Sequence, residues 1–254
     1  MNSLMRYERI MELLIASNQI TVGELSERLG VTGKTIREDL AKLEERGLLQ
    51  RVHGGAMLAH ADQLGILSMR SPVKHGSEKA EIAAAALRLI EPNDIIALDG
   101  GTTTQEMARQ LPNEPITVVT NDVMIISELA HKDAIRLVVP GGYRVRNMLA
   151  GAEAVAYIRK LNIRKAFISA TGIHADDGFT IYTGELLELK RAWIETARTS
   201  YVVADHYKFG QGALITFAEF KEIEAIVTDS GISKETEEQY QKLGVRLIIN
   251  GAKE

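Results

Sequence analysis

The stretch at residues 95–111, IIALDGGTTTQEMARQL, combines residue types that can hold a phosphate group. An apolar run ends on an aspartate, and two glycines, three threonines and a helical pattern follow it. Glycine lets the backbone approach a ligand closely, and the amides at a helix N-terminus attract anions. The aspartate could accept hydrogen bonds from sugar hydroxyls. A glycine turn with a capping threonine is common in α/β proteins, so the motif alone leaves a purely structural role open. The candidate ligand residues here are Asp99, Gly100, Gly101, Thr102, Thr103 and Thr104.

Polar residues also follow other apolar runs. Asn121 follows VVT, Gly142 follows LVVPG, and Asp205 and Lys208 follow SYVVA. Asp205 and Lys208 could together hold one end of a sugar phosphate, with the lysine acting as a point charge on the phosphate. Each of these residues taken singly is an ordinary surface polar group.

The elements that must position these residues alternate along residues 76–254. Short, near-continuous apolar runs predict buried strands, and amphipathic stretches between them predict helices. This alternation favours a largely parallel sheet covered by helices, in which ligands bind beyond the carboxyl ends of the strands. The expected strands are residues 94–99, 116–121, 135–142, 165–172, 200–205, 224–229 and 245–250. The expected helices are residues 78–90, 104–111, 123–130, 152–161, 185–197 and 234–243.

The first 58 residues follow a different pattern, of three short helices and a hairpin. A helix is expected at residues 5–17. Thr21 with Glu24 forms a capping box for a second helix that stops at Gly30, and Thr32 can cap a third. Alternation around Gly54 and Gly55 indicates a hairpin turn. Residues 59–75, with weak periodicity and a proline, are interpreted as a linker.

This order of elements is typical of a winged helix-turn-helix that reads DNA. Lys34 and Arg37 share the face of the third helix opposite its apolar stripe, where they can reach base edges or phosphates. Residues 1–58 hold eight Lys and Arg and eight Asp and Glu, so a solvated charged face or a protein-interaction module stays open. The candidate DNA-binding residues are Thr21, Thr32, Lys34, Thr35, Arg37, Glu38, Arg51, His53 and Gly54.

Composition narrows the class of protein. The chain has 254 residues, 45% apolar residues and a net charge of −4, so any DNA contact must come from a local patch. The absence of cysteine excludes disulfides and thiolate metal sites and fits the cytoplasm. The six histidines show no ligand spacing, so no metal site is expected. Neither a signal peptide nor a membrane span is recognised.

The segment TVGELSERLGVTGKTIREDLAKLEERGLLQRVHGGA resembles the N-terminal signature of the DeoR/GlpR family of bacterial transcription regulators. Thr32 replaces the usual serine, which is a harmless exchange of capping residues. Glu38 replaces the commoner second basic residue, which removes a phosphate-binding cation or lets a carboxylate accept from a cytosine amino group.

The resemblance continues through blocks such as LDGGTTT, VVTND, VVPGG and VADHYKFG. It implies a sensor domain similar in fold to ribose-5-phosphate isomerase and glucosamine-6-phosphate deaminase. It also implies a phosphorylated sugar or related metabolite as inducer, release from DNA on binding, and a homo-oligomer. The resemblance adds Lys190 to the ligand residues and expects an arginine shortly after the double glycine, for which Arg144 and Arg146 compete.

These observations predict a DNA-binding transcriptional regulator with domains at residues 1–58 and 76–254. We expect a repressor of a carbohydrate operon that a sugar phosphate releases from operator DNA, with no cofactor and no catalytic residue. The alternative is an isomerase or deaminase with an appended helical domain. That enzyme needs a general base near the sugar C1–C2 bond, for which only Asp99, Asp177 and Glu185 can be nominated.

Overall fold

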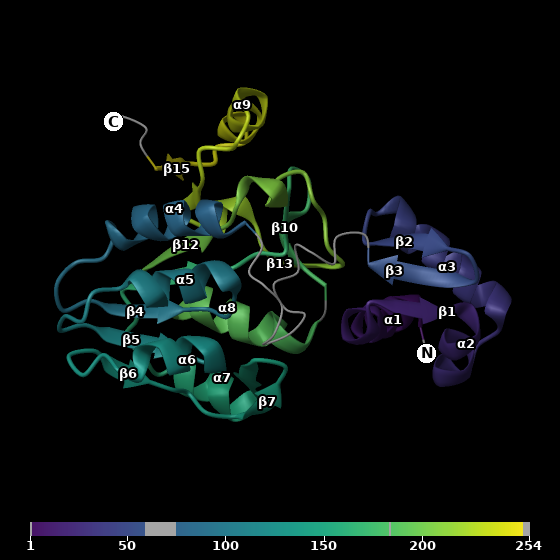
Figure 1. The fold of residues 1–254 in the computed structure, drawn as a ribbon, viewed down its shortest axis with the longest axis horizontal. Helices are drawn as coiled ribbons and strands as arrows, with labels where there is room; N and C mark the ends of the chain where they lie inside the picture. Colours follow the sequence, from purple (N-terminus) through teal and green to yellow (C-terminus); the bar gives the residue numbers. More distant parts are fainter. Residues whose placement is uncertain (1, 59–74, 183, 251–254) are drawn as a thin grey trace.

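The computed structural model describes residues 2–58, 75–182 and 184–250. Figure 1 shows a small N-terminal body, coloured purple to blue, beside a larger body that runs from blue through green to yellow. The smaller body contains residues 2–58 and the larger one residues 75–250, apart from residue 183. The expected linker at residues 59–75 lies outside the described residues except for His75, and the domain boundaries stay predictions.

The N-terminal body contains three helices and a three-stranded sheet. The helices are α1 (Ser3–Ser17), α2 (Val22–Leu29) and α3 (Gly33–Glu45). The strands β1 (Gln19–Thr21), β2 (Leu49–Val52) and β3 (Gly55–Leu58) pair antiparallel in the order β1-β3-β2. This is the expected winged helix-turn-helix with one additional strand, β1.

Helix boundaries follow the capping residues. The Thr21 hydroxyl and the Glu24 carboxylate form the expected capping box, and Gly30 ends α2 in the left-handed conformation. Thr32 caps α3 by accepting a hydrogen bond from the Thr35 amide. Helix α1 begins at Ser3, two residues before the expected start, because the Asn2 side chain accepts a hydrogen bond from the Met5 amide.

The apolar stripes of the three helices meet in one core. Buried side chains come from every element of the domain, and full burial of each leucine or isoleucine contributes about 1.5–3 kcal/mol. The largest fully buried members are Ile10, Met11, Leu14, Leu25, Ile36, Leu40 and Leu43.

The two wing glycines have different roles. Gly54 lies in the turn with φ +79°, a conformation that favours glycine. A Cβ atom on Gly55 would lie 2.2 Å from the Ile20 carbonyl oxygen, so the close approach of β3 to β1 requires glycine.

The larger body is built on a seven-stranded sheet in which every neighbouring pair is parallel. The strand order is β15-β14-β12-β9-β4-β5-β6. Six of these strands fall within their expected segments, and β12 begins one residue before its own. Their bounds are β4 (Ile95–Leu98), β5 (Thr117–Thr120), β6 (Arg136–Val138), β9 (Lys165–Ile168), β12 (Thr199–Val203), β14 (Ala225–Thr228) and β15 (Leu247–Ile249).

Helices connect these strands and cover both faces of the sheet, so that separate apolar cores form on its two sides. Each expected helix is present. Their bounds are α4 (Gly76–Leu87), α5 (Thr102–Gln110), α6 (Val123–Leu129), α7 (Ala152–Ile158), α8 (Leu187–Thr196) and α9 (Lys234–Lys242), with short 3₁₀ turns η2 (Gly184–Leu186), η3 (His206–Lys208) and η4 (Phe220–Glu222).

Two small antiparallel sheets were not expected. One pairs β7 (Tyr143–Val145) with β8 (Met148–Ala150), and the other has the order β10 (Gly172–His174), β11 (Gly178–Ile181), β13 (Ile215–Ala218). All five of these strands have only three or four residues, too few to show a period in the sequence.

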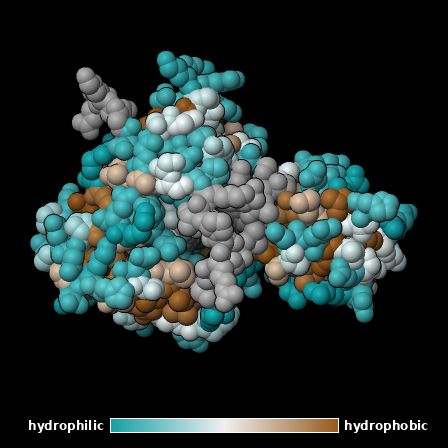
Figure 2. All heavy atoms as spheres, viewed as in Figure 1, coloured by the Kyte–Doolittle hydropathy of each residue, from teal (hydrophilic) through white to brown (hydrophobic). Residues whose placement is uncertain are grey.

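The surface in Figure 2 is mostly hydrophilic, with separate apolar patches over both bodies. No helix in the described ranges has the length and apolar character needed to cross a membrane.

Candidate functional sites

The outward face of α3 carries the side chains expected to read DNA. Lys34, Arg37 and Glu38 are exposed, while Ile36 and Leu40 are buried in the core. Thr35 is half-buried, and its hydroxyl lies 3.0 Å from that of Thr32. The helix therefore presents two cations and one carboxylate on its exposed face.

A charged pair holds α3 against α1. Asp39 is buried on the inner face of α3 and accepts two hydrogen bonds from Arg6, of 2.7 Å from Nε and 2.9 Å from Nη2. This bidentate geometry fixes orientation as well as distance. In the sequence, the Asp39 carboxylate stands next to Leu40 of the apolar stripe. The sequence analysis did not predict its role in holding the two helices together.

The wing is held to α3 by a second charged pair. Glu44 accepts hydrogen bonds from the Arg51 amide at 2.8 Å and from Arg51 Nε at 2.6 Å. These hydrogen bonds lower the pKa of the Glu44 carboxyl. Arg51, expected to contact the DNA backbone, is thus engaged within the domain, while His53 and Gly54 lie exposed at the turn.

A pocket lies at the carboxyl edge of the parallel sheet, beyond β4, β9 and β12. Its cavity is about 90 Å³, several times the roughly 10–15 Å³ that one water molecule requires. The expected ligand residues that line it are Gly100, Gly101, Thr102, Thr103, Lys190, Asp205 and Lys208. Polar or aromatic lining residues that sequence reasoning did not select are Lys79, Asn147, Ser169, Thr171 and Tyr182. Of the two competing arginines, Arg146 lines the pocket and Arg144 does not.

The N-terminus of α5 opens onto this pocket. Thr102 and Thr103 line it, whereas the Thr104 hydroxyl donates to the Gly101 carbonyl and closes the first helical turn. The amides of this turn have no helical acceptor and suit an anion.

The double glycine has a packing role in addition to any ligand role. A Cβ atom on Gly100 would lie 1.8 Å from Met148 Sδ, and one on Gly101 would lie 2.8 Å from Ser169 Cβ. Packing against Ser169 therefore favours glycine at position 101 even without a ligand, whereas the flexible end of the Met148 side chain can shift away from position 100.

Asp99 lies behind the pocket wall, in a buried pair with Lys190. Lys190 Nζ contacts Asp99 Oδ2 and also donates to the Ser169 carbonyl at 2.6 Å. The Ser169 amide and hydroxyl donate to the same carboxylate oxygen, each at 3.1 Å. Asp99 therefore orients Lys190, which itself lines the pocket.

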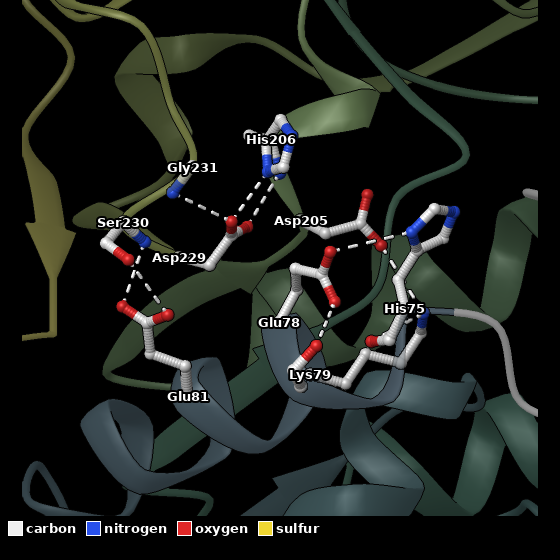
Figure 3. Close-up of polar contacts among 10 residues, drawn as sticks. His75, Glu78, Lys79, Glu81, Asp205, His206, Asp229, Ser230 and Gly231 are labelled. Atoms are coloured by element: carbon white, nitrogen blue, oxygen red, sulfur yellow. Dashed lines mark hydrogen bonds and ion pairs between the residues drawn. The ribbon is translucent and has the colours of Figure 1, made fainter.

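The other end of the pocket gathers Lys79, Asp205 and Lys208. Lys79 Nζ lies 3.5 Å from Asp205 Oδ2 and 3.5 Å from the His75 carbonyl oxygen, as Figure 3 shows. Asp205 Oδ1 is buried and accepts no hydrogen bond from the described residues. Burial lowers the pKa of Lys208 to about 8, with Asp205 opposing and Lys79 reinforcing this shift.

The loop bearing Lys208 is anchored by Asp229, a residue that sequence reasoning missed. Asp229 accepts hydrogen bonds from the His206 and Gly231 amides, at 2.8 and 3.0 Å, and its Oδ2 lies 2.6 Å from His206 Nδ1 (Figure 3). The feature of the sequence that could have identified Asp229 is its position at the end of the expected strand at residues 224–229.

Besides Asp99 and Thr104, three further expected ligand residues lie outside the pocket lining for identifiable reasons. Asn121 is buried and donates to the Leu149 carbonyl oxygen at 2.9 Å. Gly142 has φ +108°, and a Cβ atom there would lie 2.3 Å from the Ala150 carbonyl oxygen. Arg144 is exposed and donates to the Arg146 carbonyl. Their proposed contact with ligand stays a prediction.

A metal centre is not supported by the part of the chain that the structure describes, where no group of three or more candidate ligands occurs. Residues 175–177, which include Asp176 and Asp177, form the turn between β10 and β11.

A winged helix-turn-helix joined to an α/β domain with a pocket at its strand ends defines a DNA-binding regulator with a sensor domain. Residues 6–62 match the DeoR-like helix-turn-helix domain, and residues 74–230 match the DeoR C-terminal sensor domain. The chain therefore belongs to the DeoR family of transcriptional regulators.

Relatives match over nearly the whole chain. The chain is 34% identical over 237 residues to the HTH-type transcriptional regulator IolR of Bacillus subtilis (strain 168), covering 91% of this chain and 93% of that protein. It is 32% identical over 248 residues to the transcriptional repressor AccR of Agrobacterium fabrum, covering 96% of each. Ribose 5-phosphate isomerase A of Methanocaldococcus jannaschii overlaps 52% of this chain and 53% of its own, with 16% identity and a TM-score of 0.39.

Proposed function

We propose that this protein represses a carbohydrate operon and leaves its operator when a phosphorylated sugar fills the pocket. The observation that carries the proposal is one pocket that combines a helix N-terminus, the cations of Lys79 and Lys208, and an acceptor, Asp205 Oδ1, that no described residue satisfies. A phosphate suits the first two groups, and a sugar hydroxyl can donate to the third.

The proposal is for binding without turnover. An isomerase needs a carboxylate placed to move a proton at C1 or C2. Asp99 is engaged by Lys190 and Ser169 behind the wall, and neither Asp177 nor Glu185 lines the pocket. Asp205 does line the pocket, and the proposal assigns it to accept a hydrogen bond from a sugar hydroxyl. None of the three nominated bases is placed for catalysis, which favours a sensor over an enzyme. The proposal also includes the assembly and the operator. The protein acts in the cytoplasm as a homodimer or homotetramer and binds an operator with symmetric half-sites.

A thermal-shift screen of phosphorylated sugars, paired with operator binding, tests the function. A sugar phosphate should raise the melting temperature by mass action and release the DNA, and the matching unphosphorylated sugar should do neither. Steady conversion of the sugar phosphate to product would instead support the enzyme. Stabilisation without any effect on DNA affinity would contradict the role as a sensor.

Replacing Arg37 with alanine should weaken operator binding by about 1–3 kcal/mol if its guanidinium reads a base. Competition titrations against nonspecific DNA at fixed salt measure this loss. Arg246→Ala, which removes an exposed arginine of the α/β domain, is the charge-matched control and should leave affinity unchanged. Equal affinities of the Arg37 variant and the control would remove Arg37 from the recognition set.

Sugar-phosphate binding should weaken as pH rises through about 8, because Lys208 loses its proton there. Its charged fraction falls from about 90% at pH 7 to about 10% at pH 9, while the phosphate keeps its charge. We expect calorimetric affinity to fall about ten-fold over this interval. Lys208→Arg, which stays charged, should flatten the profile, and an unaltered profile in that variant would exclude Lys208 as the titrating group.

A further inference from the structure

Tyr182 packs against both domains. It directly follows β11 in the α/β domain, and its side chain lines the pocket. The same side chain is 6% exposed and is a member of the hydrophobic core cluster of the N-terminal domain. One ring therefore contacts both the ligand cavity and the core that carries the DNA-reading helix.

Neighbouring residues place this contact beside α1, which lies on the side of the N-terminal domain facing the α/β domain (Figure 1). Ala213 and Leu214, which precede β13, pack against the same core cluster. A Cβ atom on Gly184 would lie 3.2 Å from Glu8 Oε1 of α1. The residues that follow β11 and those that precede β13, at one end of this antiparallel pair, therefore meet the DNA-binding domain.

Arg146 lies within electrostatic reach of carboxylates from both domains. It lines the pocket, and burial lowers the pKa of its guanidinium, while the carboxylates of Glu185 and of Glu12 on α1 oppose that shift. A negatively charged ligand in the pocket would compete with Glu12 for this cation. Glu12 lies in the DNA-binding domain, so that competition weakens an attraction between the two domains.

We propose that Tyr182 couples occupation of the pocket to the position of α1, and through α1 to the DNA-reading helix. A ligand displaces or reorients the ring, and the core cluster of the N-terminal domain must follow because its packing leaves little free volume. The coupling rests on the proposed function, since it requires an anionic ligand in the pocket. Tyr182 acts here as a positioning residue.

Amide hydrogen exchange of the full chain tests the coupling, with inorganic phosphate as the probe and sodium chloride at equal ionic strength as the reference. In the unmodified protein, phosphate should slow exchange at residues 102–104 and change exchange in α1 by about five-fold or more, the usual lower range of coupling between sites. In Tyr182→Ala the protection at residues 102–104 should remain and the change in α1 should disappear.

Two further variants separate coupling from damage to the fold. Tyr182→Phe keeps the ring and should restore the response of α1. Leu186→Ala alters another pocket-lining side chain that packs against the α/β core alone, and should keep the response of α1. An undiminished response of α1 in Tyr182→Ala would overturn the coupling, as would its loss in Leu186→Ala with phosphate still bound.

The outcomes also separate the two proposals. Protection at residues 102–104 with no change in α1 of the unmodified protein would overturn the coupling alone. If phosphate protects neither segment, phosphate recognition by the pocket fails, and the coupling fails with it.

Discussion

Replacing Lys190 with alanine should lower the free energy of unfolding by about 3–5 kcal/mol, the usual cost of leaving a buried charge without its partner. Both members of the pair are buried, and Lys190 also donates to the Ser169 carbonyl. Without the ammonium group, the Asp99 carboxylate retains only the Ser169 donors among the described residues.

Urea unfolding at pH 7 measures this effect. Lys221→Ala is the control, because Lys221 forms an exposed pair with Glu219 and should have no measurable influence on stability. The double variant Asp99→Asn, Lys190→Met removes both charges and should recover part of the loss. A single variant as stable as the control would show that the pair does not hold the pocket wall.

Replacing Asp39 with alanine should lower stability by about 1.5–3 kcal/mol, as expected for hydrogen bonds to a charged group, and should weaken operator binding at least about ten-fold. Asp39 contacts Arg6 on the inner face of α3 and faces away from the groove. Loss of this carboxylate should weaken DNA binding because the angle between α1 and α3 is then no longer fixed by the Arg6 pair.

The adjacent residue supplies a matched control. Glu38→Ala removes the same charge from the exposed face of α3, and should keep stability and leave DNA affinity unchanged or stronger, because a carboxylate facing phosphates is lost. Denaturation and operator titrations of both variants distinguish the two roles. Weaker DNA binding in Glu38→Ala than in Asp39→Ala would contradict these roles and would make Glu38 the carboxylate on which DNA binding depends.

The central sheet was predictable from the sequence because strands buried on both faces form near-continuous apolar runs. Segments such as residues 94–99 and 224–229 therefore stood out, and each contains one strand of the sheet. The helix boundaries at Thr21 and Thr32 were predictable for a local reason, since a cap depends on residues three positions apart. Strands such as β7 and β10 lack any such local signal.

The candidate site was predictable only in part. Residues two or three positions after a strand, such as Gly101 and Asp205, line the pocket because parallel strands end at one edge. Lys79 and Tyr182 come from other elements and enter the pocket through tertiary packing, which no spacing in the sequence encodes. Asn121 also follows a strand, but its side chain bonds to the β7–β8 hairpin, whose presence was not foreseen.

The strand order also has a consequence during synthesis on the ribosome. The sheet of the N-terminal domain pairs only residues within the first 58 positions. In the larger domain, β4 can pair with β9 only after some seventy more residues have been synthesised, and β12 can pair with β14 only after β14 has been synthesised. At about 5–20 residues per second, the remaining 196 residues take about 10–40 seconds to translate. A nascent chain can thus carry a folded helix-turn-helix domain before its sensor domain has been synthesised.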